Sequence, residues 1–225
     1  VSSFYYAKNL KTITFPSTLT TIYGSDLVGS VFAGTAIETV DLSHTQFSTY
    51  GTTRSYGEPH VFVNMGALKT IKFPETLTTF SAQFFDGCSA LETVIAPGVT
   101  VVPTVGGYSP MKNKAKLTTV QLSDELVSIG DGAFYNCTSL KKITFSGENN
   151  VIIINQHAFE GCDLEGTIDL SAACVISDYA FAGNRDLTGI VTGDKLLSIS
   201  QYAFAGCRSL KDVTITSKLV KYGAY

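Results

Sequence analysis

The sequence contains no tryptophan and relatively few charged residues. Asp, Glu, Lys and Arg make up 16% of its 225 residues, whereas about 25% is usual for a globular domain. The formal net charge is −3, so the chain has no basic field to attract nucleic acid, and we exclude nucleic-acid binding. Hydrophobic residues make up 44% of the chain. That share is enough to build a buried core and argues against disorder.

Long apolar runs and catalytic motifs are also absent. No stretch of 18 apolar residues occurs, so we predict that this segment does not insert into a membrane. The sequence has no G-x-S-x-G, H-E-x-x-H, Walker or G-x-G-x-x-G motif. It also has no pair of carboxylates that can be placed at the spacing glycosidases use. We therefore predict that the chain is not an enzyme and has no catalytic residue, no cofactor and no metal ligand.

A repeat runs through the whole chain. Residues 10–15, 68–73 and 140–145 read L-K-T-I-T-F, L-K-T-I-K-F and L-K-K-I-T-F. The units begin 23 to 31 residues apart, most often 23, which lies within or close to the range of leucine-rich repeats. The predicted unit starts are Leu10, Ile37, Leu68, Leu91, Leu117, Leu140, Leu164, Leu187 and Leu210.

A second position that recurs from unit to unit supports the register of the repeat. An aromatic residue precedes most unit starts by five or six residues, often inside the phrase A-F-x-G-C. Because it recurs in step with the first pattern, we predict that these side chains stack in one continuous core. The column consists of Phe4, Phe32, Phe62, Phe85, Phe134, Phe159, Phe181 and Phe204, with Met111 in the same place of one unit.

The pattern within one unit predicts its shape. L-x-x-I-x-F alternates and is rich in β-formers, so it predicts a short strand with Leu140, Ile143 and Phe145 inward. A turn and a second apolar stretch, such as residues 126–129, follow, and the A-F-x-G-C element closes the coil as a turn or short helical segment. We predict one leucine-rich-repeat solenoid over residues 1–225, with about nine coils of about 23 residues. A parallel sheet would form one face, and turns or short helical segments the other.

Both ends of the chain are expected to fall inside a repeat. Residues 1–9 match only the tail of a unit, and the last unit, from Leu210, lacks the A-F element. Neither end has the polar cap that covers the last apolar layer of a repeat array. We expect flanking repeats or domains, and any signal peptide, to lie outside this chain.

Four of the five cysteines occupy one position of the repeat, directly after a glycine or, in one unit, after Asn136. The odd number, and the acceptance of other residue types at this position, argue against a disulfide framework. A metal site would need ligands that converge at C-x-x-C spacing, which these lack. We interpret the position as a small buried residue of the stack. Its members are Cys88, Cys137, Cys162 and Cys207, with Asn184 and Lys114 in two other units.

Departures from the repeat are the better indication of a binding surface, because loops tolerate variation and carry recognition residues. Two insertions, at residues 43–60 and 97–116, bring aromatic and basic side chains together with glycines. They can instead be tolerated insertions at the coil edge. Candidate partner-binding residues are Phe47, Tyr50, Arg54, Tyr56, His60, Tyr108 and Lys112.

The outward side of the strands is the other candidate surface. Its threonines can also reflect strand propensity alone, so the choice between insertions and strand face stays open. The outward residues are Thr12, Thr14, Thr39, Asp41, Thr70, Lys72, Gln121, Lys142, Thr144, Asp169 and Thr214.

The phrase L-x-x-I-x-F-P-x-x-L-x-x-I followed by A-F-x-G-C-x-x-L resembles the BspA-like class of leucine-rich repeats. The resemblance covers essentially the whole chain and is clearest over residues 117–207. It implies a bacterial cell-surface or secreted protein, or a protozoan surface relative, that adheres to host proteins or to other cells. It specifies no catalytic residue.

Three functions are therefore considered. The first is a cell-surface or secreted, adhesin-like scaffold that binds proteins of a host, a neighbouring cell or the matrix. The second is a carbohydrate-binding module in which the tyrosines of the insertions stack on sugars. The third is an accessory repeat domain of a larger surface enzyme.

Overall fold

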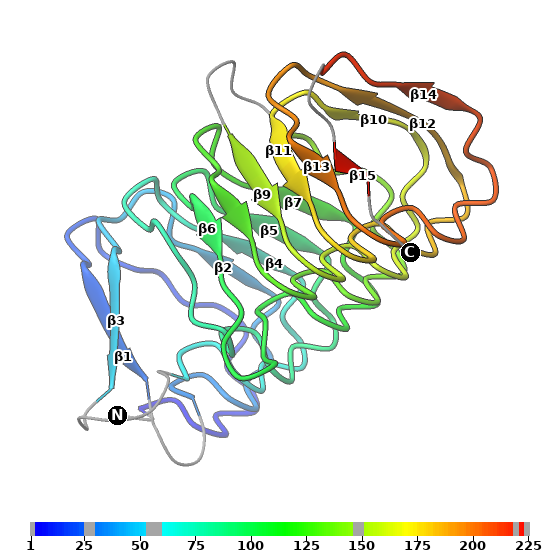
Figure 1. Ribbon diagram of the computed structural model, residues 1–225. Coiled ribbons are helices and arrows are strands. Elements are labelled where there is room, and N and C mark those ends of the chain that lie inside the picture. The colour runs from blue at the N-terminus through cyan, green and yellow to red at the C-terminus, as the bar shows by residue number, and fades with distance from the viewer. Residues whose placement is uncertain (1–2, 25–29, 53–59, 146–150, 218–220, 223–225) are drawn as a thin grey trace.

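The chain winds into an elongated parallel β-solenoid that advances from the N-terminal end to the C-terminal end (Figure 1). The computed structural model describes residues 3–24, 30–52, 60–145, 151–217 and 221–222. Strands and turns build the whole of this described part, and it contains no helix. In particular, no helix in it is long and apolar enough to cross a membrane.

The predicted strand of each unit is present in most units. Alternate side chains of the strand point inward, as in β4, where Ile71 is buried between half-buried Thr70 and Lys72. One sheet has four parallel strands, β2 (Thr39–Asp41), β4 (Thr70–Lys72), β5 (Thr93–Ile95) and β7 (Thr119–Gln121). A three-stranded parallel sheet continues the same face with β10 (Gly166–Leu170), β12 (Leu187–Thr192) and β14 (Asp212–Thr214). We call these two sheets the first face.

The first face is interrupted between β7 and β10. Residues 141–145 form no strand there, although Leu140 and Phe145 are buried and Ile143 is half-buried, as the sequence predicts. A backbone hydrogen bond still joins the two coils here, from the N–H of Glu165 to the carbonyl of Lys141. This unit is 24 residues long, one more than the 23 of its two successors. The expectation of an unbroken sheet through all units is therefore wrong at this place.

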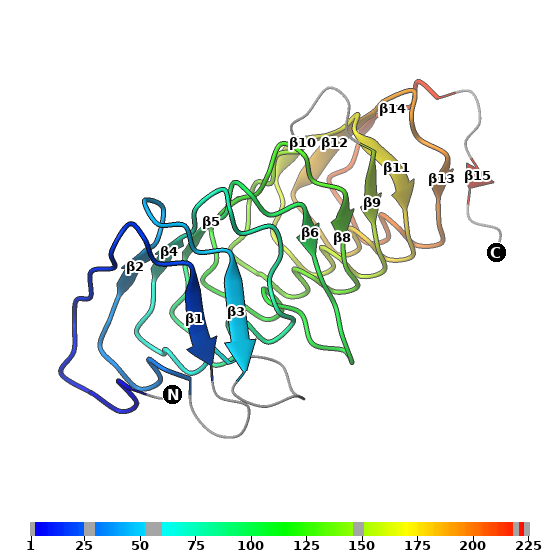
Figure 2. The same cartoon turned by 90° about the vertical axis from the view of Figure 1, so that its left-hand side faces the viewer.

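The second apolar stretch of each unit also forms a parallel sheet. Its strands are the pair β1 (Thr21–Gly24) and β3 (Thr49–Thr52), and a six-stranded sheet of β6 (Val101–Val102), β8 (Ser128–Ile129), β9 (Ile152–Ile154), β11 (Ala173–Ile176), β13 (Ser198–Ile199) and β15 (Lys221–Tyr222). Figure 2 shows these strands following one another along the molecule. We call them the second face.

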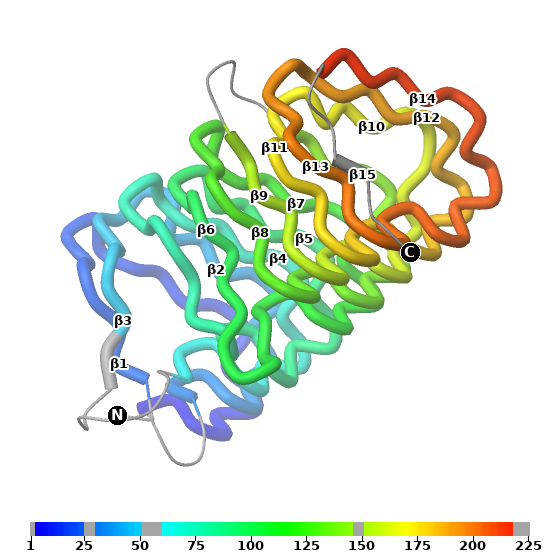
Figure 3. The backbone as a smooth tube through the Cα atoms, viewed as in Figure 1, coloured from blue at the N-terminus to red at the C-terminus, as the bar shows by residue number. Residues whose placement is uncertain are grey.

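The prediction of strands on only one face is therefore wrong, and so is the alternative of short helical segments. The stretches of successive coils lie at the same register, for instance Ser128 opposite Ile153 and Ile153 opposite Val175. Extended backbones at strand spacing hydrogen-bond to one another. The A-F-x-G-C elements form turns, and Figure 3 shows such turns repeating along one edge of the molecule.

The aromatic column is the spine of the core. The rings of Phe134 and Phe159 stack with centroids 5.0 Å apart, Phe159 and Phe181 at 5.2 Å, and Phe181 and Phe204 at 5.3 Å. Towards the N-terminus, Phe32 stacks on Phe4 and on Phe62. The predicted stack is confirmed, because rings from successive coils lie one above the next.

The cysteine position has a hydrogen-bonding role besides its small size. Each thiol donates to the carbonyl oxygen of the core-column residue in the preceding unit. The distances are 2.9 Å from Cys88 to Phe62, 3.0 Å from Cys137 to Met111, 3.0 Å from Cys162 to Phe134 and 3.3 Å from Cys207 to Phe181. Asn184 does the same through its amide, which donates to Phe159 at 2.9 Å.

These thiols are expected to be unreactive in the folded protein. All five cysteines are unpaired, and all except half-buried Cys207 are buried. Burial raises the pKa of the Cys88 thiol to about 12, and the thiolate is the reactive form. At about pH 8, Ellman's reagent should label Cys207 at most, and all five thiols after unfolding in urea. Rapid labelling of two or more thiols in the native protein would contradict the buried column.

The glycine that precedes the cysteine is needed for the backbone. Gly161, Gly183 and Gly206 have φ angles of 68°, 78° and 74°, in the left-handed region. Asn136 takes the same place with a φ of 57°. Asparagine tolerates this conformation better than most residues, so the turn closes in the same way in each unit.

Candidate binding site

The first insertion contributes less to the surface than the sequence suggests. Phe47 is fully buried and stacks on Phe73 at 6.2 Å, so it is removed from the candidate binding residues. Tyr50 is half-buried, and its ring meets Phe84 edge-on at 5.0 Å. His60 is half-buried and shares a hydrogen bond of 2.6 Å with Gln83. Arg54 and Tyr56 lie outside the described residues.

The prediction of Phe47 as a binding residue is wrong because the insertion is not a surface loop throughout. In the structure, residues 49–52 form β3, which pairs with β1, so part of the insertion belongs to the second face. An aromatic residue just before such a strand points into the core. Thr45 and Phe47 are both buried and alternate with exposed residues, as an extended segment with one side on the core does.

The second insertion folds into a small hairpin. Val105 and Tyr108 exchange backbone hydrogen bonds of 3.1 and 3.0 Å across Gly106 and Gly107. Tyr108 is 51% exposed. Lys112 lies with its amine 5.7 Å from the ring centroid of Tyr135, and the amine donates to the carbonyl of Gly107 at 3.3 Å.

This hairpin borders a hollow at the turn edge of the solenoid. The hollow measures about 390 Å³, which is within the size range of small-ligand pockets. It is lined by Thr104, Gly107, Lys112, Asp131, Gly132, Tyr135, His157 and Glu160. We call it the Gly132 hollow. It brings together one predicted binding residue, Lys112, and groups from the two following coils that the sequence did not single out for binding.

Aromatic side chains stack on one side of this hollow. His157, Tyr179 and Tyr202 occupy the same place in successive coils, two residues before the core phenylalanine. The His157 and Tyr179 rings are 5.1 Å apart and nearly parallel, and Tyr179 and Tyr202 are 4.9 Å apart. We call these three side chains the surface ladder. The sequence predicts His157 as a surface turn residue, and the structure shows it half-buried within this ladder.

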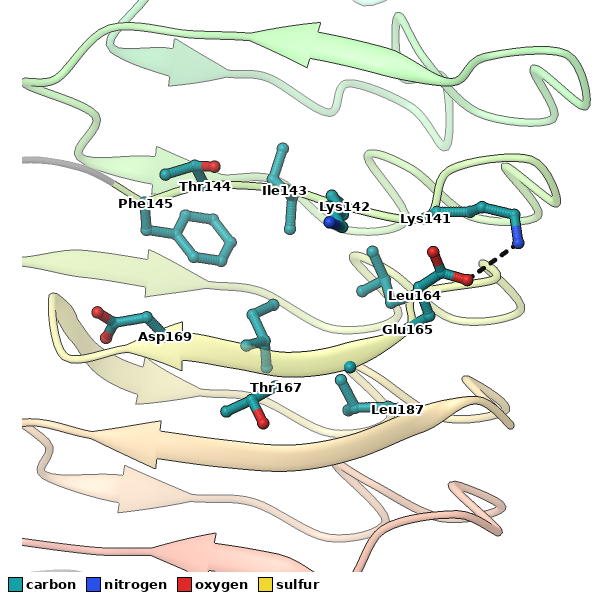
Figure 4. Close-up of a pocket in the computed structure, with 12 residues that line it drawn as sticks. Lys141, Lys142, Ile143, Thr144, Phe145, Leu164, Glu165, Thr167, Asp169 and Leu187 are labelled. Carbon is teal, nitrogen blue, oxygen red and sulfur yellow. Dashed lines mark hydrogen bonds and ion pairs between the residues drawn. The ribbon is translucent and has the colours of Figure 1, made fainter.

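The outward side of the first face is mostly polar, although Val191 is exposed on β12. Charged residues of adjacent coils pair across it. Lys69 lies 2.8 Å from Glu38, and Lys141 lies 3.0 Å from Glu165 (Figure 4). Lys72 lies 3.5 Å from Asp41, and a hydrogen bond from Ser43 and the nearby lysine hold the pKa of Asp41 below its usual value. Exposed pairs of this kind contribute little to stability, but they give these charged side chains a partner of opposite charge within the protein.

The interruption of the first face leaves a shallow hollow between residues 141–145 and β10 (Figure 4). Its volume is about 330 Å³. Thr144 and Asp169 lie at one end and the Lys141–Glu165 pair at the other. No group of three or more His, Cys, Asp or Glu side chains is placed to hold a metal ion in the described ranges.

The outward side of the second face is apolar. Val127, Ile153 and Leu197 are 52%, 39% and 55% exposed, and Val151 is also exposed. Val175 is half-buried and lies opposite Ile153 on the next strand. We call these five residues the apolar row. The sequence interpretation missed it, although the outward position of the second apolar stretch often carries valine, isoleucine or leucine where the first face carries threonine and lysine.

Comparison with protein families gives a match over the whole chain. Residues 1–104, 56–173 and 107–225 match the family described as "BspA type Leucine rich repeat region", in six copies. Six copies are fewer than the nine coils predicted. Two of the predicted units carry insertions, and the units that begin at Leu10 and Leu140 form no strand on the first face, so several depart from the regular repeat. A comparison with curated protein sequences gave no match.

Solved structures with a similar fold are bacterial leucine-rich repeat proteins. The leucine-rich repeat protein of T. pallidum is 23% identical, with a TM-score of 0.59 over 68% of this chain and 72% of that one. A leucine-rich repeat protein from Bacteroides ovatus is 17% identical, with a TM-score of 0.48 over 96% and 63%. A leucine-rich cell surface protein from Faecalibacterium prausnitzii is 16% identical, with a TM-score of 0.33 over 96% and 89%. The T. pallidum likeness shows a shared fold.

Proposed function

This chain belongs to the family of BspA type leucine-rich repeat proteins, and from that membership we propose that it is a cell-surface or secreted scaffold that binds proteins and catalyses no reaction. Repeat solenoids present extended surfaces suited to protein partners. The family resemblance supports a location outside the cell and an adhesin-like role. The partner would be a protein of a host cell, a neighbouring cell or the extracellular matrix.

The observation that carries this proposal is the apolar row. Single exposed apolar side chains are common on protein surfaces, but these lie on four successive coils of the second face. Ile153 and Val175 lie within β9 and β11, and the other three lie directly before β8, β9 and β13. Ile153 and Val175 are register partners, and Val127 accepts a backbone hydrogen bond from Ile153. A contiguous exposed apolar patch marks an interaction site. The first face has paired charges in the corresponding place, so the second face is the better recognition surface.

The partner's matching surface should therefore be apolar and rather flat. The row's side chains stand on a sheet, where they project roughly perpendicular to it. Removing each one from water would contribute about 1.5–3 kcal/mol at full burial. Several such side chains together would supply the apolar centre that interfaces require.

Replacing Ile153 and Leu197 by lysine together should weaken binding at least tenfold, because two charges would be placed in an apolar contact. Binding can be measured by surface plasmon resonance on immobilised laminin and collagen, with serum albumin as a negative surface. The matched control is Thr119→Lys with Gln121→Lys, which adds the same charge to the outward side of β7. Equal affinity of the parent and the Ile153/Leu197 variant would remove the apolar row from the proposal. Saturable binding to neither matrix protein would count against the matrix as the partner.

A further inference from the structure

The surface ladder ends at His157 on its N-terminal side. In the coil before His157, the ladder position is occupied by Gly132, whose backbone N–H donates to the carbonyl of Gln156. Tyr179 covers one side of the His157 ring at 5.1 Å. The Gly132 coil has no side chain to cover the other side, and His157 lines the hollow instead. The vacant position therefore offers a stacking place for one ring.

The backbone at Gly132 shows that this vacancy is real space. A Cβ atom built on Gly132 would meet only the Cβ of Tyr135, at 3.6 Å, an ordinary contact. The φ angle of Gly132 is 59°, and those of His157, Tyr179 and Tyr202 are 56°. An aromatic side chain is thus tolerated in this conformation in three other coils. Glycine at this place leaves out a ring that the fold can hold.

Polar groups surround the vacant place. Glu160 holds the His157 imidazole through a hydrogen bond with Nδ1, and the carboxylate of Asp131 accepts from the backbone N–H of Gln156 at 3.1 Å. Thr104 donates to the carbonyl of Asp131 at 2.7 Å. Lys112 supplies a cation above Tyr135. Two fixed carboxylates and one ammonium group thus lie at the rim of a stacking surface.

This combination fits a sugar ring better than an aromatic side chain. The C–H groups on one side of a pyranose can pack on the imidazole, as the positive edges of aromatic rings pack on ring faces. Its hydroxyls can donate to Asp131 and Glu160 and accept from Lys112. A phenyl or phenol ring would bury the carboxylates with few or no partners, which costs free energy. Two carboxylates against one ammonium also disfavour an acidic sugar.

We propose that the Gly132 hollow binds one neutral pyranose ring of a glycan, stacked on His157 in the place that the ladder leaves vacant. This site lies on the turn edge and shares no residue with the apolar row. It adds glycan recognition to the protein-binding function and does not depend on it. Its residues also differ from the tyrosines of the first insertion.

The experiment that tests this proposal places a side chain in the hollow by the substitution Gly132→Tyr. The full chain is screened on an array of neutral, sialylated and sulfated glycans, and the neutral glycan with the strongest signal is titrated by calorimetry. Gly132→Tyr should extend the ladder by one ring into the hollow and lower the affinity at least tenfold. Its thermal unfolding should lie close to that of the parent, because stacking on His157 offsets the strain of a side chain at this φ, as in the neighbouring coils that carry tyrosine. His157→Ala, which removes the stacking surface without filling the hollow, should cause a similar loss.

The control is Tyr202→Ala, which removes an exposed ring of the same ladder that does not line the hollow. Its affinity for the glycan should equal that of the parent. The proposal is overturned if no neutral glycan binds, if only acidic glycans bind, or if both Gly132→Tyr and His157→Ala retain full affinity. Should Gly132→Tyr fail to fold, His157→Ala alone decides between these outcomes.

Discussion

Truncating Phe181 to alanine is expected to lower the free energy of unfolding by about 3–5 kcal/mol. Its ring is fully buried and stacks on both neighbours, at 5.2 Å from Phe159 and 5.3 Å from Phe204. Alanine would remove both contacts and leave a cavity inside the spine, where the surrounding coils can relax only in part. Urea unfolding followed by circular dichroism measures the change.

Phe204→Ala is the matched comparison, because Phe204 is half-buried and is stacked on Phe181. The decrease in the free energy of unfolding should be clearly smaller for Phe204→Ala than for Phe181→Ala. In a repeat array each coil contacts mainly its neighbours, so hydrogen exchange in Phe181→Ala should rise most in the adjacent coils. A loss below about 1 kcal/mol would mean that the stacked column is not the main source of stability here.

Replacing Asn184 by leucine should lower the free energy of unfolding by about 1–3 kcal/mol, for a different reason. Asn184 is fully buried, and its amide group donates to the carbonyls of Phe159 and Phe181 at 2.9 and 2.8 Å. Its side-chain oxygen accepts from the N–H of Leu164 at 3.0 Å. Leucine has a similar size but no polar atom, so the Leu164 N–H would lose its partner. The carbonyls of Phe159 and Phe181 would each lose one donor and keep another, the Cys162 N–H and the Cys207 thiol. Each buried unsatisfied group costs about 1–3 kcal/mol.

Asn184→Cys gives the control, since cysteine is the residue that other coils use here. Its thiol should restore one donor to the Phe159 carbonyl, as Cys162 donates to Phe134. We expect its free energy of unfolding to lie between those of the parent and Asn184→Leu, in the same urea experiment. If leucine is as stable as the parent, the hydrogen bonds of this position contribute no net stability.

The architecture could be predicted from the sequence because one unit repeats. A strand at residues 140–145 alone would be ambiguous, but its agreement with residues 10–15 and 68–73 fixes the register. Burial confirms this at Leu140 and Phe145. The ion pairs Lys69–Glu38 and Lys141–Glu165 join the same position of neighbouring coils, which agrees with this register.

The second face could not be predicted as a sheet in the same way. A stretch such as residues 126–129 has only one or two outward positions, and a period of two cannot be recognised over so few residues. Pairing between coils depends on where each chain segment returns in space. The same limit applies to the interruption at residues 141–145, whose sequence is as strand-like as that of its neighbours.

The candidate site was predicted in part. The insertion at residues 97–116 does border the Gly132 hollow through Thr104, Gly107 and Lys112. The remaining groups of the hollow belong to regular coils, where Gly132 differs from its counterparts only by having no side chain. A glycine in the coil directly before three coils that carry His157, Tyr179 and Tyr202 at this place was the available signal. Its meaning depends on the ring stacking that only the structure shows.

The hydrogen bonds of the cysteine position affect how repeat units can be added to the array. Each thiol at this position donates a hydrogen bond to a backbone carbonyl of the unit before it, as Cys162 does to Phe134 and Cys207 to Phe181. A duplicated unit therefore carries its own donor and offers its own acceptor, so the copy fits beside the original without any compensating substitution. Gene duplication within the array can lengthen the molecule while the bonding of every older unit stays as it was.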